Sequence, residues 1–305
     1  MARPRVLVTG ASGFIGSHVV RELVRRDCEV AALVSDRTRY ARLADVLDHI
    51  RPIHQRMAGA RSAILEFQPE ACIHLAWYAR PGRYLDSQEN VTVLAGSLKL
   101  LQTLIDAGCN HAVMTGTCAE YAPSADALTE SSPIRPSTLY AASKLALGQV
   151  GSFAASVGQM GFSWARIFYL YGPDEDPRRL IPGLIQALQR GECFRATPGQ
   201  QVRDYLHVED VAAALCHLAL TRQSGIYNIA SGEPVTVRQV METVCELMGK
   251  PGSVDFGALE YRSREPMVIY GDNTRLRAAG WAPRYTLRAG LQQTIDWWAA
   301  QQRSS

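Results

Sequence analysis

The sequence predicts an α/β protein with a doubly wound parallel sheet and a smaller, interleaved C-terminal lobe. Short apolar runs alternate with helical patterns through the first half of the chain, as expected for parallel βαβ units. A glycine-rich turn joins the first run to the first helical pattern, and after Gly172 the chain changes to loops rich in Pro, Arg and Asp. We therefore expect a sheet domain over 1–168 and the smaller lobe mainly over 169–305, with 226–230 returning to the main sheet.

Each predicted strand is a short apolar run with β-branched residues, which is the pattern of a strand buried on both faces. Helical patterns, with apolar residues three or four positions apart, separate these runs. The predicted strands lie at 5–8, 30–34, 71–76, 111–115 and 163–168.

Composition and charge exclude several classes of protein. A chain of 305 residues can bury a large core. The net charge is +3 with scattered basic residues, and no apolar run is long enough to span a bilayer, so we predict no nucleic acid and no membrane as partner. The seven cysteines are dispersed without a Cys-x-x-Cys pair, which argues against disulfides and predicts a reducing, cytoplasmic location. Since no histidine–carboxylate cluster has ligand spacing, we predict no metal.

The glycine-rich turn, Thr9 to Gly16, predicts a dinucleotide site because it follows a strand and opens a helix. Gly10 allows a tight turn, Gly13 lets backbone amides approach a pyrophosphate, and Gly16 permits close packing of helix on strand. The helix N-terminus attracts the phosphates. An ordinary glycine-rich turn is the alternative. The residues predicted to bind the cofactor here are Gly10, Ser12, Gly13, Phe14, Ile15 and Gly16.

A second motif, Tyr140-Ala-Ala-Ser-Lys144, places a phenol and an ammonium on one face of a helix. A nearby cation favours the phenolate, so the tyrosine can act as an acid or a base near neutral pH. The hydroxyl of Thr117 precedes this pair. We predict Thr117, Tyr140 and Lys144 as the catalytic residues; the alternative for Tyr140 is a buried core phenol.

The Gly-x-x-Gly-x-x-Gly spacing, with Tyr140, Lys144 and an upstream threonine, resembles the short-chain dehydrogenase/reductase superfamily. More narrowly, the chain resembles its extended branch, the NAD-dependent epimerase/dehydratase family acting on nucleotide sugars. The resemblance extends from the glycine loop to 280–283 and implies a Rossmann fold. It rests also on His74-Leu75-Ala76, Asn90, Tyr171-Gly172-Pro173 and the segment 203–210. It further implies that Leu75, Ala76, Asn90 and Lys144 contact the cofactor.

Cofactor choice depends on the end of the second strand, where an NAD site normally places an acidic residue. That position falls near Val34 and is followed by Ser35, Asp36 and Arg37. Ser35 and Arg37 suit the 2′-phosphate of NADP(H), which we therefore favour. NAD(H) stays possible, with Asp36 turned towards the ribose and Arg37 as a solvated surface charge.

The segment after the catalytic hydroxyl discriminates between reactions. Related 4,6-dehydratases carry Asp-Glu directly after the hydroxyl, where this chain has Cys118 and Ala119. The resemblance therefore disfavours water elimination. Glu120 is close by but out of register, and Cys118 is interpreted as a small packing residue.

The predicted substrate site contains two arginines, Arg203 and Arg264, at positions that match diphosphate-binding arginines of the family. Arginine suits this role because its planar fork contacts phosphate oxygens bidentately; surface ion pairs are the alternative. Tyr78, Thr117, Tyr140 and Tyr169 complete the predicted substrate contacts, although the family often has Asn in place of Tyr169.

Four further polar residues receive a structural interpretation. His74 ends a buried strand and His207 lies inside the predicted diphosphate segment, so both are expected to pack rather than to react. Asp204 and Asp210 are expected to orient loops.

We therefore predict an NADPH-dependent reductase that delivers hydride to the C4 carbonyl of a nucleotide-diphosphate 4-keto-6-deoxy sugar, with Tyr140 as proton donor. The first alternative is an NAD-dependent nucleotide-sugar 4-epimerase, and the second is a non-catalytic protein that senses the dinucleotide. The resemblance also implies a homodimer paired through helices at 90–107 and 140–156.

Overall fold

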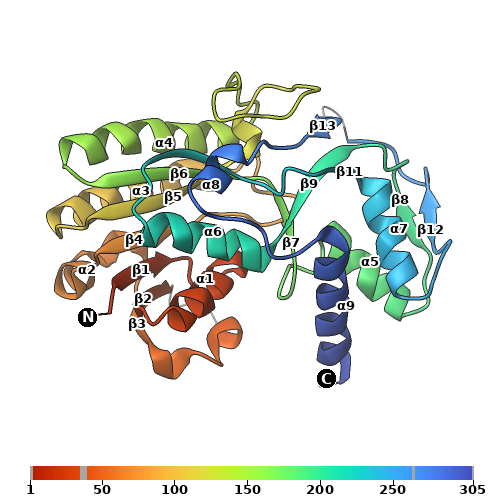
Figure 1. The fold of residues 1–305 in the computed structure, drawn as a ribbon, viewed down its shortest axis with the longest axis horizontal. Coiled ribbons are helices and arrows are strands. Elements are labelled where there is room, and N and C mark those ends of the chain that lie inside the picture. Colours follow the sequence, from red (N-terminus) through yellow and green to blue (C-terminus); the bar gives the residue numbers. More distant parts are fainter. Residues whose placement is uncertain (1–2, 35–39, 263–264, 304–305) are drawn as a thin grey trace.

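The computed structural model describes residues 3–34, 40–262 and 265–303, and its centre is a parallel sheet. The strand order is β10-β6-β5-β4-β1-β2-β3 (Figure 1). This arrangement confirms the predicted doubly wound α/β fold. The strands are β1 (Arg5–Thr9), β2 (Glu29–Val34), β3 (Ile50–His54), β4 (Ala71–His74), β5 (His111–Thr117), β6 (Gly161–Ile167) and β10 (Gly225–Ile229).

The two faces of the sheet bury separate apolar cores. On β1, Val6 and Val8 face the core covered by α1 and α6, whereas Leu7 faces the core covered by α2, α3 and α4. This alternation follows from the two-residue period of a strand, and it explains why the run is apolar throughout. The covering helices are α1 (Phe14–Arg25), α2 (Arg61–Phe67), α3 (Glu89–Asp106), α4 (Leu139–Val157) and α6 (Val208–Leu220).

Strand β10 belongs to the main sheet although it follows the first elements of the smaller lobe. It pairs in parallel with β6, from Gly225 opposite Ser163 to Ile229 opposite Ile167. The chain therefore leaves the sheet after β6, builds part of the lobe, and returns through α6 to the sheet edge.

The smaller lobe has its own core between α5 (Leu180–Gln189), α7 (Val237–Leu247) and α9 (Leu287–Arg303). These helices lie beside one another, away from the main sheet (Figure 1). Strand β9 connects the lobe to the sheet domain, because α6 begins directly where β9 ends. The strands here are β7 (Tyr169–Tyr171), β8 (Phe194–Ala196), β9 (Val202–His207), β11 (Pro234–Thr236), β12 (Val254–Phe256) and β13 (Val268–Ile269).

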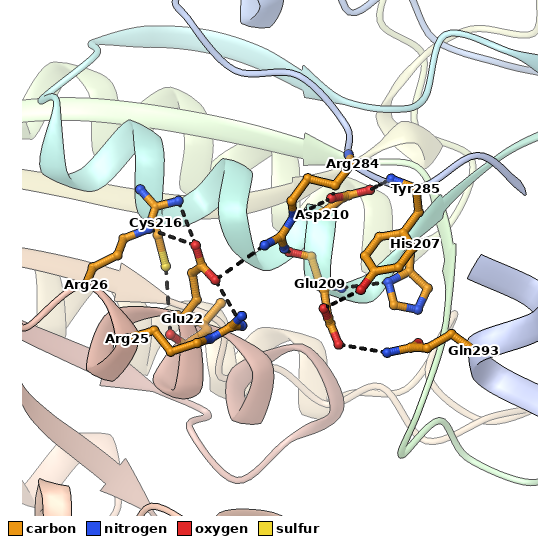
Figure 2. A network of polar contacts seen from close by, with 11 residues as sticks. Glu22, Arg25, Arg26, His207, Glu209, Asp210, Cys216, Arg284, Tyr285 and Gln293 are labelled. Carbon is orange, nitrogen blue, oxygen red and sulfur yellow. Dashed lines mark hydrogen bonds and ion pairs between the residues drawn. The ribbon is translucent and has the colours of Figure 1, made fainter. Parts of the chain in front are cut away.

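A polar network joins the two parts at the start of α6 (Figure 2). The carboxylate of Asp210 accepts hydrogen bonds from the backbone amides of Arg284, at 3.1 Å, and Tyr285, at 3.0 Å. The carboxylate of Glu209 accepts from the Tyr285 phenol at 2.9 Å and from Nε2 of Gln293, on α9, at 3.0 Å. The loop-orienting contacts expected of Asp210 are therefore present.

Among the helices of the described chain, none combines the length and apolarity needed to cross a membrane.

Candidate active site

In the glycine loop, neighbouring backbone atoms leave no space for a side chain at two of the glycines. Gly10 has a φ of 66°, and a Cβ there would lie 2.7 Å from the amide nitrogen of Ala76. A Cβ on Gly16 would lie 2.0 Å from the carbonyl oxygen of Gly10. Both positions therefore require glycine, in agreement with the turn and packing roles that the motif predicts. The same contact places the backbone of Leu75 and Ala76 against the loop.

Helix α1 offers an open N-terminus at this loop. Its N-cap residue is Gly13, no side chain caps it, and its first turn contains no acidic residue. The first amides of a helix have no intrahelical partner and carry the positive end of the dipole. This cradle fits the pyrophosphate of a dinucleotide, with Ser12, Phe14 and Ile15 adjoining it, and the contacts predicted for these residues stay predictions.

The fold brings together the three predicted catalytic side chains. Thr117 ends β5, while Tyr140 and Lys144 lie in the first turns of α4, whose N-cap Thr138 accepts a hydrogen bond from the amide of Ala141 at 3.2 Å. The hydroxyl of Thr117 lies close enough to the phenol of Tyr140 to act on its pKa. Nζ of Lys144 donates to the carbonyl oxygen of Thr115 at 2.7 Å. Motif spacing therefore placed these groups correctly on neighbouring elements.

Two aromatic side chains that motif reasoning missed enclose this cluster. The ring of Tyr84 meets that of Tyr140 edge-on, with centroids 4.9 Å apart. The ring of Trp77 lies 4.0 Å from Nζ of Lys144, and its Nε1 donates to Oδ1 of Asn90 at 2.9 Å. The aromatic content of the segment after β4, which also contains the half-buried Tyr78, was the available signal.

Asn90 is fully buried and holds the loop that carries Tyr84. Its amide nitrogen donates to the carbonyl oxygens of Tyr84, at 2.6 Å, and Ser87, at 2.9 Å. The predicted contact of Asn90 with the cofactor stays a prediction.

Burial controls the charge state of the catalytic pair. It raises the pKa of Tyr140, and the nearby Thr117 hydroxyl offsets only part of that rise. Burial also lowers the pKa of Lys144 to about 7, against the opposing effect of the Glu120 carboxylate. The expected net stabilisation of a phenolate is not found, because desolvation outweighs it and the ammonium is directed at the Thr115 carbonyl. In this state Tyr140 carries its proton.

Glu120, although out of register with the acid of the related dehydratases, lies at the centre of a buried polar cluster. Its Oε1 accepts from the backbone amide of Thr117 at 2.8 Å. Its Oε2 accepts from Nε1 of Trp164 at 3.0 Å and from Nε of Arg166 at 2.8 Å. Neither side chain of the ion pair is more than 4% exposed. The carboxylate is thus fully engaged, which leaves no free acid or base after the catalytic hydroxyl.

Cys118 packs as predicted. It lies against the small apolar cluster of Tyr121, Leu128 and Phe168. Burial raises the pKa of its thiol to about 12, so the reactive thiolate is disfavoured.

The predicted substrate residues are only partly described. Arg203 is buried, its Nη2 forms an ion pair with Oε1 of Glu265 at 3.2 Å, and its guanidinium lies 5.1 Å from the ring of Tyr169. Burial raises the pKa of Tyr169. Three residues of the prediction lie outside the described part of the chain: Ser35, Arg37 and Arg264.

His74 and Asp204 have contacts that account for their burial. Nδ1 of His74 lies 2.6 Å from the Thr9 hydroxyl and Nε2 lies 2.8 Å from that of Ser97, while burial lowers the pKa of the imidazole to about 3. Asp204 accepts from the amides of Ser231 (2.7 Å) and Gly232 (3.0 Å), and so orients that loop. No group of three potential metal ligands occurs among the described residues.

Comparison with known proteins agrees with this geometry. The profile of the NAD dependent epimerase/dehydratase family matches residues 6–230, and the chain belongs to this family. It is 27% identical to CDP-abequose synthase of Salmonella typhimurium, covering 95% of this chain and 97% of the relative. It is 31% identical to dTDP-glucose 4,6-dehydratase of Streptomyces griseus, covering 96% and 93%.

A solved structure, the UDP-glucose 4-epimerase of Thermus thermophilus in complex with NAD, is 28% identical. It superposes with a TM-score of 0.84 over 97% of this chain and 99% of that one. Family members are NAD-dependent oxidoreductases, epimerases and dehydratases of nucleotide sugars. The relatives thus carry several activities on one fold, so the choice among them depends on the site.

Proposed function

We propose that this protein reduces a nucleotide-diphosphate 4-keto-6-deoxy sugar with NADPH. The observation that carries the proposal is the buried phenol of Tyr140, beside Thr117. Because burial raises its pKa, it is a phenol at neutral pH. A reductase needs a proton donor at the start of its turnover, whereas oxidation of a sugar hydroxyl needs a base first.

The residues would act in a simple order. A bound nicotinamide dinucleotide would supply the hydride. Tyr140 would donate its proton to the carbonyl oxygen of the substrate as that oxygen becomes negative. Thr117, beside Tyr140, would hold the same oxygen in line, and the ammonium of Lys144 would stabilise the resulting phenolate. Arg203 would exchange part of its pairing with Glu265 for the diphosphate of the substrate.

Water elimination is not part of this proposal. A 4,6-dehydratase needs an acid and a base after the hydroxyl, and this chain offers a protonated thiol at Cys118 and the methyl group of Ala119. The nearest carboxylate, Glu120, is engaged by Trp164 and Arg166.

A 4-epimerase is the second candidate, favoured by the likeness to the Thermus epimerase–NAD complex. The two candidates differ in the fate of the cofactor, which an epimerase regenerates within each turnover and a reductase consumes. The third candidate, a dinucleotide sensor without catalysis, would not require Tyr140.

The deciding experiment follows nicotinamide absorbance. Purified protein receives NADPH or NADH together with 4-keto-6-deoxy nucleotide sugars made in place by a dehydratase. We expect substrate-dependent loss of NADPH. Absence of consumption, together with NAD released on denaturation, would instead establish the epimerase.

We also propose a homodimer in the cytoplasm. The outward face of α4 is uncharged, and Phe153 and Val157 are 79% and 87% exposed on it. Beside them lies a cavity of about 520 Å³ lined partly by Gln102 and Ile105 of α3. Light scattering should give twice the chain mass, and Phe153→Asp should give the monomer; a wild-type monomer would refute this part.

A further inference from the structure

The carboxylate of Glu120 is the feature of the catalytic centre that the proposed mechanism leaves unused. It belongs to a 3₁₀ turn, η4 (Cys118–Glu120), that begins directly after Thr117. The turn is closed by a capping box: the amide of Thr117 donates to Glu120, and the Thr117 hydroxyl accepts from the amide of Ala119 at 3.2 Å. The position of the Thr117 hydroxyl is thus fixed from both sides by η4.

Gly116 leaves room for the Glu120 carboxylate because it has no side chain. A Cβ on Gly116 would lie 2.6 Å from both Oε1 of Glu120 and Nε1 of Trp164. Gly116 separates Thr115, whose carbonyl accepts from Lys144, from Thr117, whose amide donates to Glu120. The carboxylate and the ammonium therefore attach to backbone groups two residues apart on β5.

Among the groups that act on Lys144 in the described structure, Glu120 is the negatively charged one, and its carboxylate is also paired with Arg166. His74 lies close enough to feel the ammonium, but burial keeps its imidazole neutral. Tyr140, on the same helix, is a phenol. Trp77 contributes a ring face, and Thr115 a carbonyl and a hydroxyl. The Glu120 carboxylate is the group that opposes the loss of the Lys144 proton.

We propose that Glu120 is a positioning residue of the catalytic centre: its carboxylate fixes the backbone that presents the Thr117 hydroxyl and supplies the counter-charge of Lys144. Glu120 touches neither substrate nor cofactor in this proposal and acts through those two residues. The inference rests on the proposed function only for its kinetic test, since the charge relation can be measured without any substrate.

The charge relation is tested by titrating Lys144 directly. The chain contains three lysines, Lys99, Lys144 and Lys250, so protein labelled with ¹³C at lysine Cε gives a spectrum of three signals. Loss of one signal in Lys144→Arg assigns it. We expect Glu120→Gln, which keeps a hydrogen-bond acceptor but removes the charge, to lower the pKa of Lys144 by about one unit.

Glu130→Gln is the matched control. Oε1 of Glu130 accepts from the amide of Asn228 at 2.9 Å, and its backbone carbonyl accepts from Arg166, so it belongs to the same network without contacting Thr117. A fall in the pKa of Lys144 in Glu120→Gln alone supports the proposal. An unchanged value, or an equal fall in both variants, overturns it.

Glu120→Gln leaves Arg166 buried without its partner, which by itself can prevent folding. The double variant Glu120→Gln with Arg166→Met removes both charges and serves as the second test. Its reference is Arg166→Met alone, because loss of the nearby Arg166 charge by itself raises the pKa of Lys144. A lower pKa of Lys144 in the double variant than in Arg166→Met supports the proposal, and equal values overturn it.

The positioning relation is tested by kinetics, in whichever direction the enzyme turns over. Glu120→Ala removes the acceptor for the Thr117 amide as well as the charge. We expect its kcat to fall about tenfold below that of Glu120→Gln, with little change in KM, because misplacement of a reacting group acts on the chemical step. Equal kcat values for the two variants would overturn the proposal that Glu120 positions Thr117. Absence of turnover in the wild type would refute the proposed function and leave the titration of Lys144 valid.

Discussion

The molecule contains two polar clusters, each built around buried carboxylates, and they connect different elements. The Glu120 cluster (Glu120, Trp164 and Arg166) lies under the catalytic residues within the sheet domain. The interlobe cluster contains Glu22, Glu209, Asp210, Arg284, Tyr285 and Gln293, and joins α1 and α6 to α9 and the segment before it (Figure 2).

The two clusters also differ in redundancy. The Glu120–Arg166 pair is closed to solvent, with side chains 0% and 4% exposed. In the interlobe cluster the side chain of Arg284 is 43% exposed, and Glu22 has Arg25 and Arg26 as further partners. We infer that loss of Arg166 leaves the Glu120 carboxylate buried without an ionic partner, whereas Glu22 in the interlobe cluster keeps ionic partners when Arg284 is lost.

The largest effect is expected on kcat when Tyr140, the proposed proton donor, is substituted. Tyr140→Phe should lower kcat by about 10²–10⁴-fold, the usual loss for a general acid. The thermal midpoint should change little, because the ring still packs against Tyr84 and Trp77. Cofactor consumption and thermal unfolding measure the two effects, and Tyr227→Phe, which removes a phenol that donates to the Ser224 carbonyl, is the control. Near-normal turnover would remove Tyr140 from the mechanism and favour the sensor.

The next prediction compares the Glu120 cluster with the interlobe cluster by the free energy of unfolding that each contributes. Arg166→Met leaves the Glu120 carboxylate buried without its ionic partner, and should reduce the free energy of unfolding by about 3–5 kcal/mol. Denaturant unfolding measures it. A loss below about 1 kcal/mol, which is typical of an exposed ion pair, would contradict the inference that the buried Glu120 carboxylate depends on Arg166 as its ionic partner.

The matched substitution in the interlobe cluster is Arg284→Met. It removes the bonds from Nε to Asp210 and from Nη2 to the Glu209 carbonyl. Asp210 keeps the two backbone amides, and Glu22 keeps its other arginines. We expect a loss of about 1 kcal/mol by the same unfolding measurement. A loss as large as that of Arg166→Met would refute the difference in redundancy.

The sequence predicted the features that recur at fixed spacing. Alternate side chains of β1 belong to the two cores on opposite faces of the sheet, as the period of a strand predicts. The glycine spacing anticipated the contact between Gly16 and Gly10. Tyr140 and Lys144 could be placed because a helix has a known period. These are local rules, and each applies within a few residues of the chain.

The Glu120 cluster was not predictable in the same way. Glu120, Trp164 and Arg166 come from η4 and β6, and their meeting depends on strand pairing, which places Gly116 opposite Arg166. The family register gives Glu120 no role, since it does not stand where a dehydratase has its acid. The ion pair of Arg203 with Glu265 likewise joins distant segments. The lowered pKa of Lys144 depends on burial, which spacing alone does not give.

The smallest effect tests the interlobe cluster through pH. Burial alone would raise the pKa of Glu209, but hydrogen bonds from Tyr285 and Gln293, with the nearby His207, lower it overall. A carboxyl whose pKa is lowered by folding stabilises the fold above its unfolded pKa, about 4.3, and loses that contribution as the pH falls through the folded value.

Tyr285→Phe removes the phenol that donates to Glu209 at 2.9 Å. It should therefore cost about 1 kcal/mol at neutral pH and progressively less as the pH falls below about 4. Urea unfolding at a series of pH values measures this, with Tyr227→Phe as control, because the Tyr227 phenol donates to the carbonyl of Ser224, which does not titrate. A cost for Tyr285→Phe that stays constant with pH would mean that the contribution of the hydroxyl does not depend on the charge of Glu209. Absence of any cost would mean that the ring's packing against His207, with centroids 4.3 Å apart, carries the stabilisation, because Phe keeps that ring.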